Sequence, residues 1–200
     1  MYRPHPFAID DPSEILRFIT ANAFGQLLSI DSGRIVSSYL PWHYDSQART
    51  LRGHLAHNNP QLESIAGSEV LVTLEGPHGY ISPRWYTKGG VPTWNYQAVH
   101  LTGRATTFTE PTRLAELVAT LSAHYEAQFP EPWQPSYPPS MLKAIVGVEI
   151  DVTDIQAKYK LSQNRTRDEV EQVCAQLEAK GEHALAAAMR RALEQHSEAD

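Results

Sequence analysis

The stretch GQLLSIDSGRIVSSYLPWHYD, residues 25–45, changes the period of the hydrophobic pattern and decides the fold class. Apolar and polar residues alternate in two short runs on either side of Asp31, Ser32 and Gly33. A period of two is typical of a strand with one buried face, and Asp, Ser and Gly are residues that a hairpin turn favours. We therefore predict a β-hairpin here, as the first pair of an antiparallel sheet.

Further runs with strand character follow this hairpin along the chain. Few helical patterns separate them, so an antiparallel sheet closed as a barrel is favoured over a doubly wound parallel fold. The sequence predicts a mainly β protein with flanking helices, of the α+β class, with five or six strands. The later strands are expected at TLRGHLA (50–56), SEVLVTLEG (68–76), AVHLTGRATTFT (98–109) and AIVGVEIDVTDIQAKYK (144–160).

Helices are expected where apolar residues recur at helical spacing behind a capping residue. The first should begin near Asp10 or Asp11 with Pro12 in its first turn, because proline suits that position. Gly181 should divide the last helical stretch into two helices. We expect one domain over residues 1–165 and a C-terminal helical extension, 166–200, packed on it. The other helices are expected at NPQLESIA (59–66), where Asn59 can cap, and EPTRLAELVATLSAHYEAQF (110–129).

Composition limits the classes of protein to consider. The chain has 200 residues, 42% of them hydrophobic, which is enough for one compact core. No apolar run approaches the roughly 20 residues of a membrane span, and the first residues contain no apolar signal region. We expect a cytoplasmic protein without membrane segments. The single cysteine, Cys174, excludes an intramolecular disulfide and a cysteine-rich zinc site.

Direct binding to nucleic acid is not expected. The formal net charge is −6, which opposes a general attraction to phosphates. The most basic helical stretch, AAAMRRALEQH (186–196), offers only Arg190 and Arg191, followed by Glu194. A recognition helix needs more base-reading and phosphate-binding side chains than this.

Common catalytic and metal motifs are absent. The nine histidines are scattered, and the close pair His54 and His57 would fall on opposite faces of a strand. There is no HExxH, no GxSxG and no glycine-rich phosphate loop. Ser82 precedes a proline and has no base visible near it in the sequence. We expect no metal site, and the residue types do not identify a catalytic residue.

Three short segments, expected as loops, concentrate aromatic and amide side chains: GHLAHNNPQ (53–61), GPHGYISPRWY (76–86) and VPTWNY (91–96). Their rings can stack on a flat ligand while neighbouring hydroxyl and amide groups hydrogen-bond to it. Alternatively, the rings fill a corner of the barrel. The ring candidates are Trp85, Tyr86, Trp94 and Tyr96, the hydrogen-bonding candidates Ser82, Thr93 and Asn95, and the phosphate candidates Arg52, Arg84, Lys88 and the helix start at Asn58 and Asn59.

Five motifs in the same order give the chain a resemblance to a known family. It resembles the PaiB-like family of FMN-binding negative transcriptional regulators over about residues 1–165. The C-terminal helices are less distinctive. The motifs are MYRPHPF (1–7), LRGHLAHNNPQ (51–61), GPHGYISPRWY (76–86), VPTWNYQAVHLTGR (91–104) and YKLSQNR (159–165).

The resemblance implies a six-stranded antiparallel split β-barrel, similar to pyridoxamine-phosphate oxidases, that works as a homodimer with FMN in clefts at the subunit interface. Three groups of residues would then contact the flavin. Arg52, His54, Asn58, Asn59 and Gln61 would hold its phosphate and ribityl side; Ser37 and Ser38 would face the ring, which Thr93, Trp94 and Asn95 would approach from the same or the second subunit; Lys160, Ser162, Gln163 and Asn164 would close the cleft.

The sequence leaves more than one function open. The first is an FMN-binding transcriptional regulator that acts indirectly. The alternative is an FMN-dependent oxidoreductase using NAD(P)H and an unknown small-molecule acceptor, in which His54 or Tyr96 could assist proton movement. A third is a dimeric scaffold without flavin, in which the last helices supply dimer contacts through Val170, Val173, Leu177 and Leu185.

Overall fold

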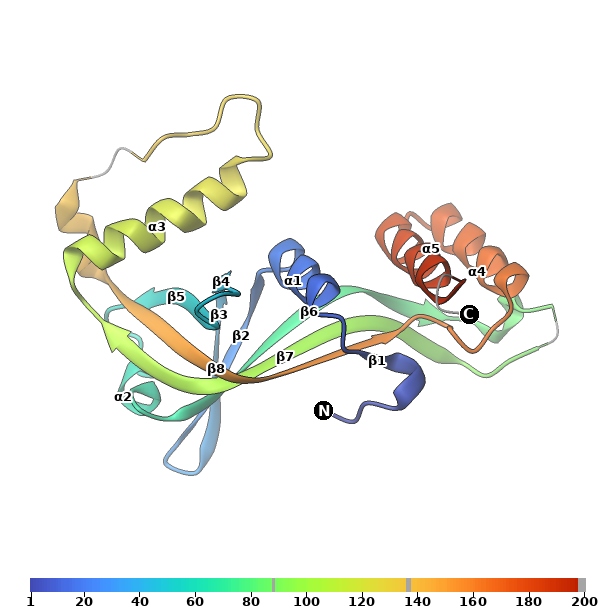
Figure 1. The fold of residues 1–200 in the computed structure, drawn as a ribbon, viewed down its shortest axis with the longest axis horizontal. Helices are drawn as coiled ribbons and strands as arrows, with labels where there is room; N and C mark the ends of the chain where they lie inside the picture. Colours follow the sequence, from blue (N-terminus) through green and yellow to red (C-terminus); the bar gives the residue numbers. More distant parts are fainter. Residues whose placement is uncertain (88, 136–137, 198–200) are drawn as a thin grey trace. The chain divides into compact units, whose positions relative to one another are not determined.

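The computed structural model describes residues 1–87, 89–135 and 138–197, so Lys88 lies outside the described residues. Strands and helices alternate irregularly along the chain (Figure 1). The strands are β1 (Ala8–Ile9), β2 (Phe24–Asp31), β3 (Arg34–Pro41), β4 (His43–Asp45), β5 (Thr50–Ala56), β6 (Glu69–Ile81), β7 (Thr93–Phe108) and β8 (Ile145–Lys160). The α-helices are α1 (Pro12–Ala21), α2 (Leu62–Ile65), α3 (Pro111–Glu126), α4 (Arg167–Ala179) and α5 (His183–Ser197), and the 3₁₀ turns are η1 (His5–Phe7), η2 (Pro83–Trp85) and η3 (Pro139–Ala144).

The strands form one sheet in the order β3-β2-β6-β7-β8-β5-β4, with β1 paired to β8. The pairs whose register is defined are antiparallel. This confirms the predicted class, a mainly antiparallel β protein with flanking helices. The sheet has eight strands rather than six, because two short ones, β1 and β4, are too brief to leave a periodic signal in the sequence.

The predicted hairpin is present as β2 and β3. Asp31 pairs with Arg34, and only Ser32 and Gly33 separate the strands. Both turn residues have positive φ, 48° for Ser32 and 77° for Gly33. A two-residue hairpin turn with positive φ at both positions matches the twist of the strands it joins.

Two stretches expected as loops are strand ends. β6 continues through residues 76–81, and Thr93–Tyr96 begins β7. In β7 the side chain of Trp94 is 55% exposed, whereas its neighbour Asn95 is 1% exposed. A polar residue therefore occupies the buried face and an apolar residue the exposed face. The alternation of buried and exposed positions is then not visible as an alternation of apolar and polar residues in the sequence.

The chain divides into two compact units, which we describe separately. Unit 1 consists of residues 1–15, 75–99 and 156 onward, and unit 2 consists of residues 16–74 and 100–155. The strands β6, β7 and β8 contribute residues to both units. The division expected at residue 165 stays a prediction.

The core of unit 2 combines the inner sheet face with a cluster under α3. Leu27, Leu51 and Ile150 are fully buried in the sheet. A Cβ atom added at Gly147 would come within 2.2 Å of the Phe108 ring, so glycine is required for this contact. The cluster under α3 comprises Phe108, Leu114, Leu117, Leu121 and Leu142.

In unit 1 the helices α4 and α5 pack side by side (Figure 1). Thr166 and Glu169 form a capping box at the start of α4, and Gly181 has φ +82° at the break, as predicted. The side chains proposed as dimer contacts, Val170, Val173, Leu177 and Leu185, are at most 1% exposed within a single chain. They leave no surface for a second subunit, so that interpretation is wrong.

The first helix begins where the sequence predicts. Asp11 Oδ1 accepts a hydrogen bond from the Ser13 amide at 2.9 Å, and α1 starts at Pro12. This bond satisfies one of the amides that a helix start leaves without a partner. Among the described residues, no helix has the length and apolar character needed to cross a membrane.

Candidate functional site

A polar cluster in unit 2 joins the β2–β3 hairpin to the segment before α2. Asn59 Nδ2 donates to Ser38 Oγ at 3.0 Å, and Asn59 Oδ1 accepts from the Gln61 amide at 2.9 Å. The expected helix cap at Asn59 therefore caps a turn, and α2 begins only at Leu62. We call Ser29, Ser38, Asn59 and Gln61 the hairpin cluster.

Gln61 is the buried member of the hairpin cluster, with only 5% of its surface exposed. Its Nε2 donates to Leu27 O at 3.1 Å, to Ser29 Oγ at 3.0 Å and to Val36 O at 3.4 Å. Its Oε1 is buried without a hydrogen-bond partner. The buried Gln61 side chain thus hydrogen-bonds to both strands of the hairpin. The nearby residues Ser37 and Asn58 are exposed.

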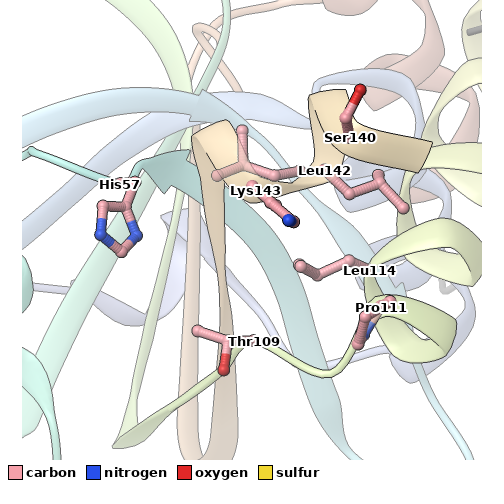
Figure 2. A pocket seen from close by; sticks show the side chains of 8 residues that line it. His57, Thr109, Pro111, Leu114, Ser140, Leu142 and Lys143 are labelled. Carbon is pink, nitrogen blue, oxygen red and sulfur yellow. The ribbon is translucent and has the colours of Figure 1, made fainter. Parts of the chain in front are cut away.

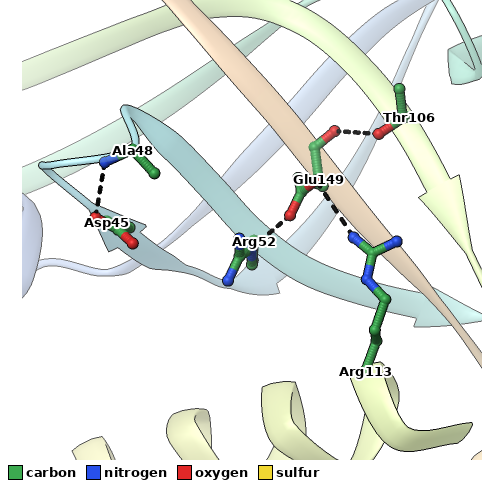
Figure 3. Close-up of polar contacts among 6 residues, drawn as sticks. All are labelled: Asp45, Ala48, Arg52, Thr106, Arg113 and Glu149. Carbon is green, nitrogen blue, oxygen red and sulfur yellow. Dashed lines mark hydrogen bonds and ion pairs between the residues drawn. The ribbon is translucent and has the colours of Figure 1, made fainter. Parts of the chain in front are cut away.

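Arg52 lies on β5 in an ion-pair network (Figure 3). Its Nε is 2.5 Å from Glu149 Oε2, and Arg113 Nη2 is 3.3 Å from Glu149 Oε1. The Arg113 guanidinium also lies 4.0 Å from the centre of the Phe108 ring. Glu149 therefore neutralises part of the charge, while the Arg52 side chain remains 40% exposed.

His54 lies two residues after Arg52 on β5, so the two side chains share a face of the strand. Its Nδ1 is buried and has no hydrogen-bond partner. Burial lowers the pKa of its imidazole. His54 is consequently neutral near pH 7 and does not add positive charge for a phosphate.

In unit 1, Asn95 and Ser162 form a buried polar cluster. Asn95 Nδ2 donates to Ser162 Oγ at 2.9 Å and to Met189 Sδ at 3.4 Å. The Tyr86 hydroxyl lies 3.2 Å from Ser162 Oγ. Ser162 itself has φ +67°, a left-handed conformation that its contacts hold in place. We call Tyr86, Asn95, Ser162 and Met189 the Asn95 cluster, and its Asn95 Oδ1 is buried without a partner.

Trp94 lies on the opposite face of β7 and is 55% exposed. The rings of His78 and Tyr80 on β6 are each centred 6.4 Å from the Trp94 ring. A cavity of about 610 Å³ opens beside these three rings. It also contacts Trp85, Lys180 and Glu182, and its aromatic lining suits a flat ring.

The remaining predicted residues make local contacts. Lys160 Nζ donates to Trp94 O at 2.8 Å and also to Thr93 Oγ1, which brings three predicted residues together. Burial and the neighbouring Lys158 lower the pKa of Lys160. Ser82 Oγ caps η2 by accepting a hydrogen bond from the Arg84 amide at 3.3 Å. Gln163 Nε2 donates to Tyr159 O at 2.5 Å, and Gln163 Oε1 accepts from the Leu161 amide at 2.7 Å.

Sequence reasoning named no role for two side chains that complete these surfaces. Glu149 holds Arg52, and Tyr80 flanks Trp94. The ring residues His78 and Tyr80 are two positions apart, and this spacing indicates a strand with both rings on one face. The stretch was expected to be a loop, whereas it is the end of β6. Within the part of the chain that the structure describes, no group of three or more His, Cys, Asp or Glu residues could hold a metal ion.

Comparisons with known proteins identify a sequence relative with a named role. The chain is 40% identical over 186 residues to the "Protease synthase and sporulation protein PAI 2" of Bacillus subtilis (strain 168), covering 89% of each chain. Two solved structures share the fold. The flavocytochrome Anf3 of Azotobacter vinelandii has a TM-score of 0.66 at 13% identity, covering 86% of this chain and 78% of that one.

The second is the FAD and heme binding protein of Mycobacterium smegmatis, with a TM-score of 0.64 at 13% identity, covering 84% of this chain and 79% of that one. Both structural likenesses concern the split-barrel fold. The family described as "Putative FMN-binding domain" matches residues 1–154, which include the hairpin cluster and Trp94. The chain therefore belongs to this FMN-binding domain family.

Proposed function

We propose that the protein is a flavoprotein, with two separate sets of candidate FMN contacts: Ser37, Ser38, Asn58 and Asn59 in unit 2, and Trp94 in unit 1. One observation carries this proposal. Residues whose side chains can bind a ligand lie at the surface, and buried amide side chains next to them hold their segments in place. Ser38 and Asn59 are bonded to each other beside the exposed Ser37 and Asn58, and Trp94 presents its ring to solvent. The family match over residues 1–154 covers both regions.

The residues present fit the chemistry of FMN. Hydroxyl and amide groups of Ser37, Ser38, Asn58 and Asn59 suit ribityl hydroxyls and phosphate oxygens, and the exposed Trp94 ring suits an isoalloxazine. The unpartnered Nδ1 of His54 is a further polar group on the β5 face. When bound, FMN supplies hydride or electron transfer. The chain's own residues would supply binding and orientation.

Two of the residues predicted to touch the flavin are better placed to hold neighbouring residues in position than to touch it themselves. Gln61 and Asn95 are 5% and 1% exposed, so a ligand at the surface does not reach their side chains. Gln61 holds the backbone that carries Asn59 and Ser38, and Asn95 holds the segment after β8 through Ser162. We propose both as positioning residues.

We further propose that any effect on transcription is indirect. Arg190, the leading candidate for a phosphate contact on α5, is bonded to Glu171 at 2.9 Å and also to Glu178. Its charge is thus committed within the helix pair, in a chain of net charge −6. A sequence-selective, salt-sensitive shift of promoter DNA by the isolated protein would contradict this.

The outer hairpin supports the proposal of a homodimer. Phe24, Ile30, Ile35 and Tyr39 are each 59–75% exposed on β2 and β3, and the Phe24 and Tyr39 rings stack with centres 6.0 Å apart. Exposed apolar side chains gathered on one hairpin are typical of an interface. Ile35→Asp should shift sedimentation toward the monomer, whereas Val91→Asp, at another exposed apolar position, should not. Unchanged sedimentation of Ile35→Asp would contradict this interface.

A second candidate function, the FMN-dependent oxidoreductase, is favoured by the cavity beside Trp94. Its volume of about 610 Å³ leaves room for a second ring. The test is turnover of NADH or NADPH by the FMN-loaded protein with a panel of quinone and nitroaromatic acceptors. Activity above that of free FMN supports an enzyme, and its absence with every acceptor counts against one.

FMN binding is tested by titrating the purified protein with FMN and following flavin fluorescence quenching and the visible absorption spectrum. Saturable binding in the micromolar range is expected, with weaker binding of riboflavin because it lacks the phosphate. Asn59→Ala should weaken FMN binding without unfolding the protein, since Asn59 is partly exposed. A folded wild-type protein that neither quenches nor shifts the flavin spectrum would overturn the proposal.

A further inference from the structure

A second cavity lies in unit 2, and one of its lining residues, His57, directly precedes Asn58 of the proposed flavin contacts. Its volume is about 580 Å³, and it opens between the start of α3, η3 and the start of β8 (Figure 2). Pockets for small molecules usually measure roughly 300–1,000 Å³. No residue of the predicted flavin set lines it; the lining residues are His57, Thr109, Pro111, Leu114, Ser140, Leu142, Lys143 and Ile145.

The floor of the cavity is apolar and rigidly held. Leu114 and Leu142 are 2% and 7% exposed and belong to the cluster under α3, and Ile145 packs against that cluster. Figure 2 shows Leu114 and the end of the Lys143 side chain directed toward the same space, with His57 at the opposite edge of the view. An apolar group placed there would be removed from water against a preformed surface.

The rim of the cavity carries positive charge. Lys143 supplies this charge, and none of the eight lining residues is an Asp or Glu. The cavity also includes the first residue of α3, Pro111, and a helix start has a positive partial charge. Glu110, just outside the lining set, bonds to the Thr109 amide at 3.2 Å and does not cap the helix with its side chain.

We propose that this cavity binds a small amphipathic carboxylate, with its apolar body on Leu114, Leu142 and Ile145 and its carboxylate at Lys143. Charge complementarity favours an anion, because Lys143 is a cation and no lining residue is an acid that would neutralise it. The apolar floor selects a hydrocarbon body over a sugar or a nucleotide. The inference stands independently of the flavin proposal.

The test uses octanoate as the probe and its uncharged isostere octanamide as the control. The protein is labelled at its Leu and Ile methyl groups, and methyl shifts are followed during each titration. Octanoate should move the signals of Leu114, Leu142 and Ile145 saturably, and octanamide should bind about fivefold more weakly, as expected for a partly exposed charge-assisted contact.

Lys143→Met keeps the aliphatic stem and removes the charge, so it should weaken octanoate binding about fivefold and leave octanamide binding unchanged. Arg191→Met, which removes an exposed positive charge in the other unit, is the control and should change neither. Equal binding of the two probes, or unchanged octanoate binding by Lys143→Met, would overturn the proposal. Displacement of octanoate by FMN would also overturn it, because the cavity would then belong to the flavin site.

Discussion

The hairpin cluster of unit 2 and the Asn95 cluster of unit 1 use the same kind of side chain at different depths. In the hairpin cluster a buried amide, Gln61, stands behind the partly exposed Asn59 and Ser38. In the Asn95 cluster the amide is buried on one face of β7, and the ligand-type residue, Trp94, lies on the other face. We propose that depth, rather than residue type, separates residues that bind a ligand from residues that hold the fold.

The largest expected effect comes from placing a charge at the deeper position of the hairpin cluster. Gln61→Glu points a carboxylate at Leu27 O and Val36 O, which Gln61 now reaches with its amide. Burying this charge against two carbonyl oxygens, with the Ser29 hydroxyl as a neighbouring donor, should lower the free energy of unfolding by about 3 kcal/mol at pH 7. Chemical denaturation measures this change.

The exposed neighbour Asn58 supplies the matched control for that experiment. Asn58→Asp introduces the same charge at the surface and should change the free energy of unfolding by less than about 0.5 kcal/mol. If Gln61→Glu is as stable as Asn58→Asp, the hydrogen bonds of the buried Gln61 side chain do not stabilise the hairpin as its contacts indicate.

A smaller loss is expected at the Asn95 cluster. Asn95→Ala removes the donor to Ser162 Oγ and leaves a small cavity, but Ser162 keeps the Tyr86 hydroxyl as a partner. The free energy of unfolding should fall by about 1–2 kcal/mol. Thermal and chemical denaturation of the variant would sharpen the comparison, and wild-type stability would show that the cluster contributes nothing to the fold.

The smallest effect concerns pH. Burial lowers the pKa of His54 in the folded chain below its ordinary value of 6.5. As the pH falls through 6.5, His54 therefore binds a proton in the unfolded chain before it does so in the folded chain. Stability should therefore decrease as pH falls through this value, and the decrease should be smaller in His54→Gln. Urea denaturation at about pH 7.5 and about pH 5.5 measures both slopes. Identical slopes would mean that His54 is not kept neutral by burial.

Much of the fold could be predicted because its signals are local. The turn at Ser32 and Gly33, the start of α1 after Asp11 and the break at Gly181 each depend on a few neighbouring residues. β1 and β4 could not be predicted, since strands of two and three residues have no periodicity. The ends of β6 and β7 were missed because glycine, proline and buried amides interrupt their apolar alternation.

The candidate site was predictable in its residue types but not in its geometry. The sequence placed Asn59 and Gln61 two residues apart without indicating that one side chain is accessible and the other is 5% exposed. The ion pair of Arg52 depends on Glu149, which is distant in sequence and lies opposite on β8. Such pairings follow from strand register, which a single sequence does not supply.

The most direct test of depth as the deciding factor uses the adjacent residues Trp94 and Asn95. FMN is titrated into Trp94→Ala and Asn95→Ala, and the stability of both variants is measured in the same buffer. We predict that Trp94→Ala binds FMN about tenfold more weakly, through lost ring stacking, at unchanged stability. Asn95→Ala should retain FMN affinity while losing stability. Full FMN affinity in Trp94→Ala, together with lost affinity in a stable Asn95→Ala, would contradict the account.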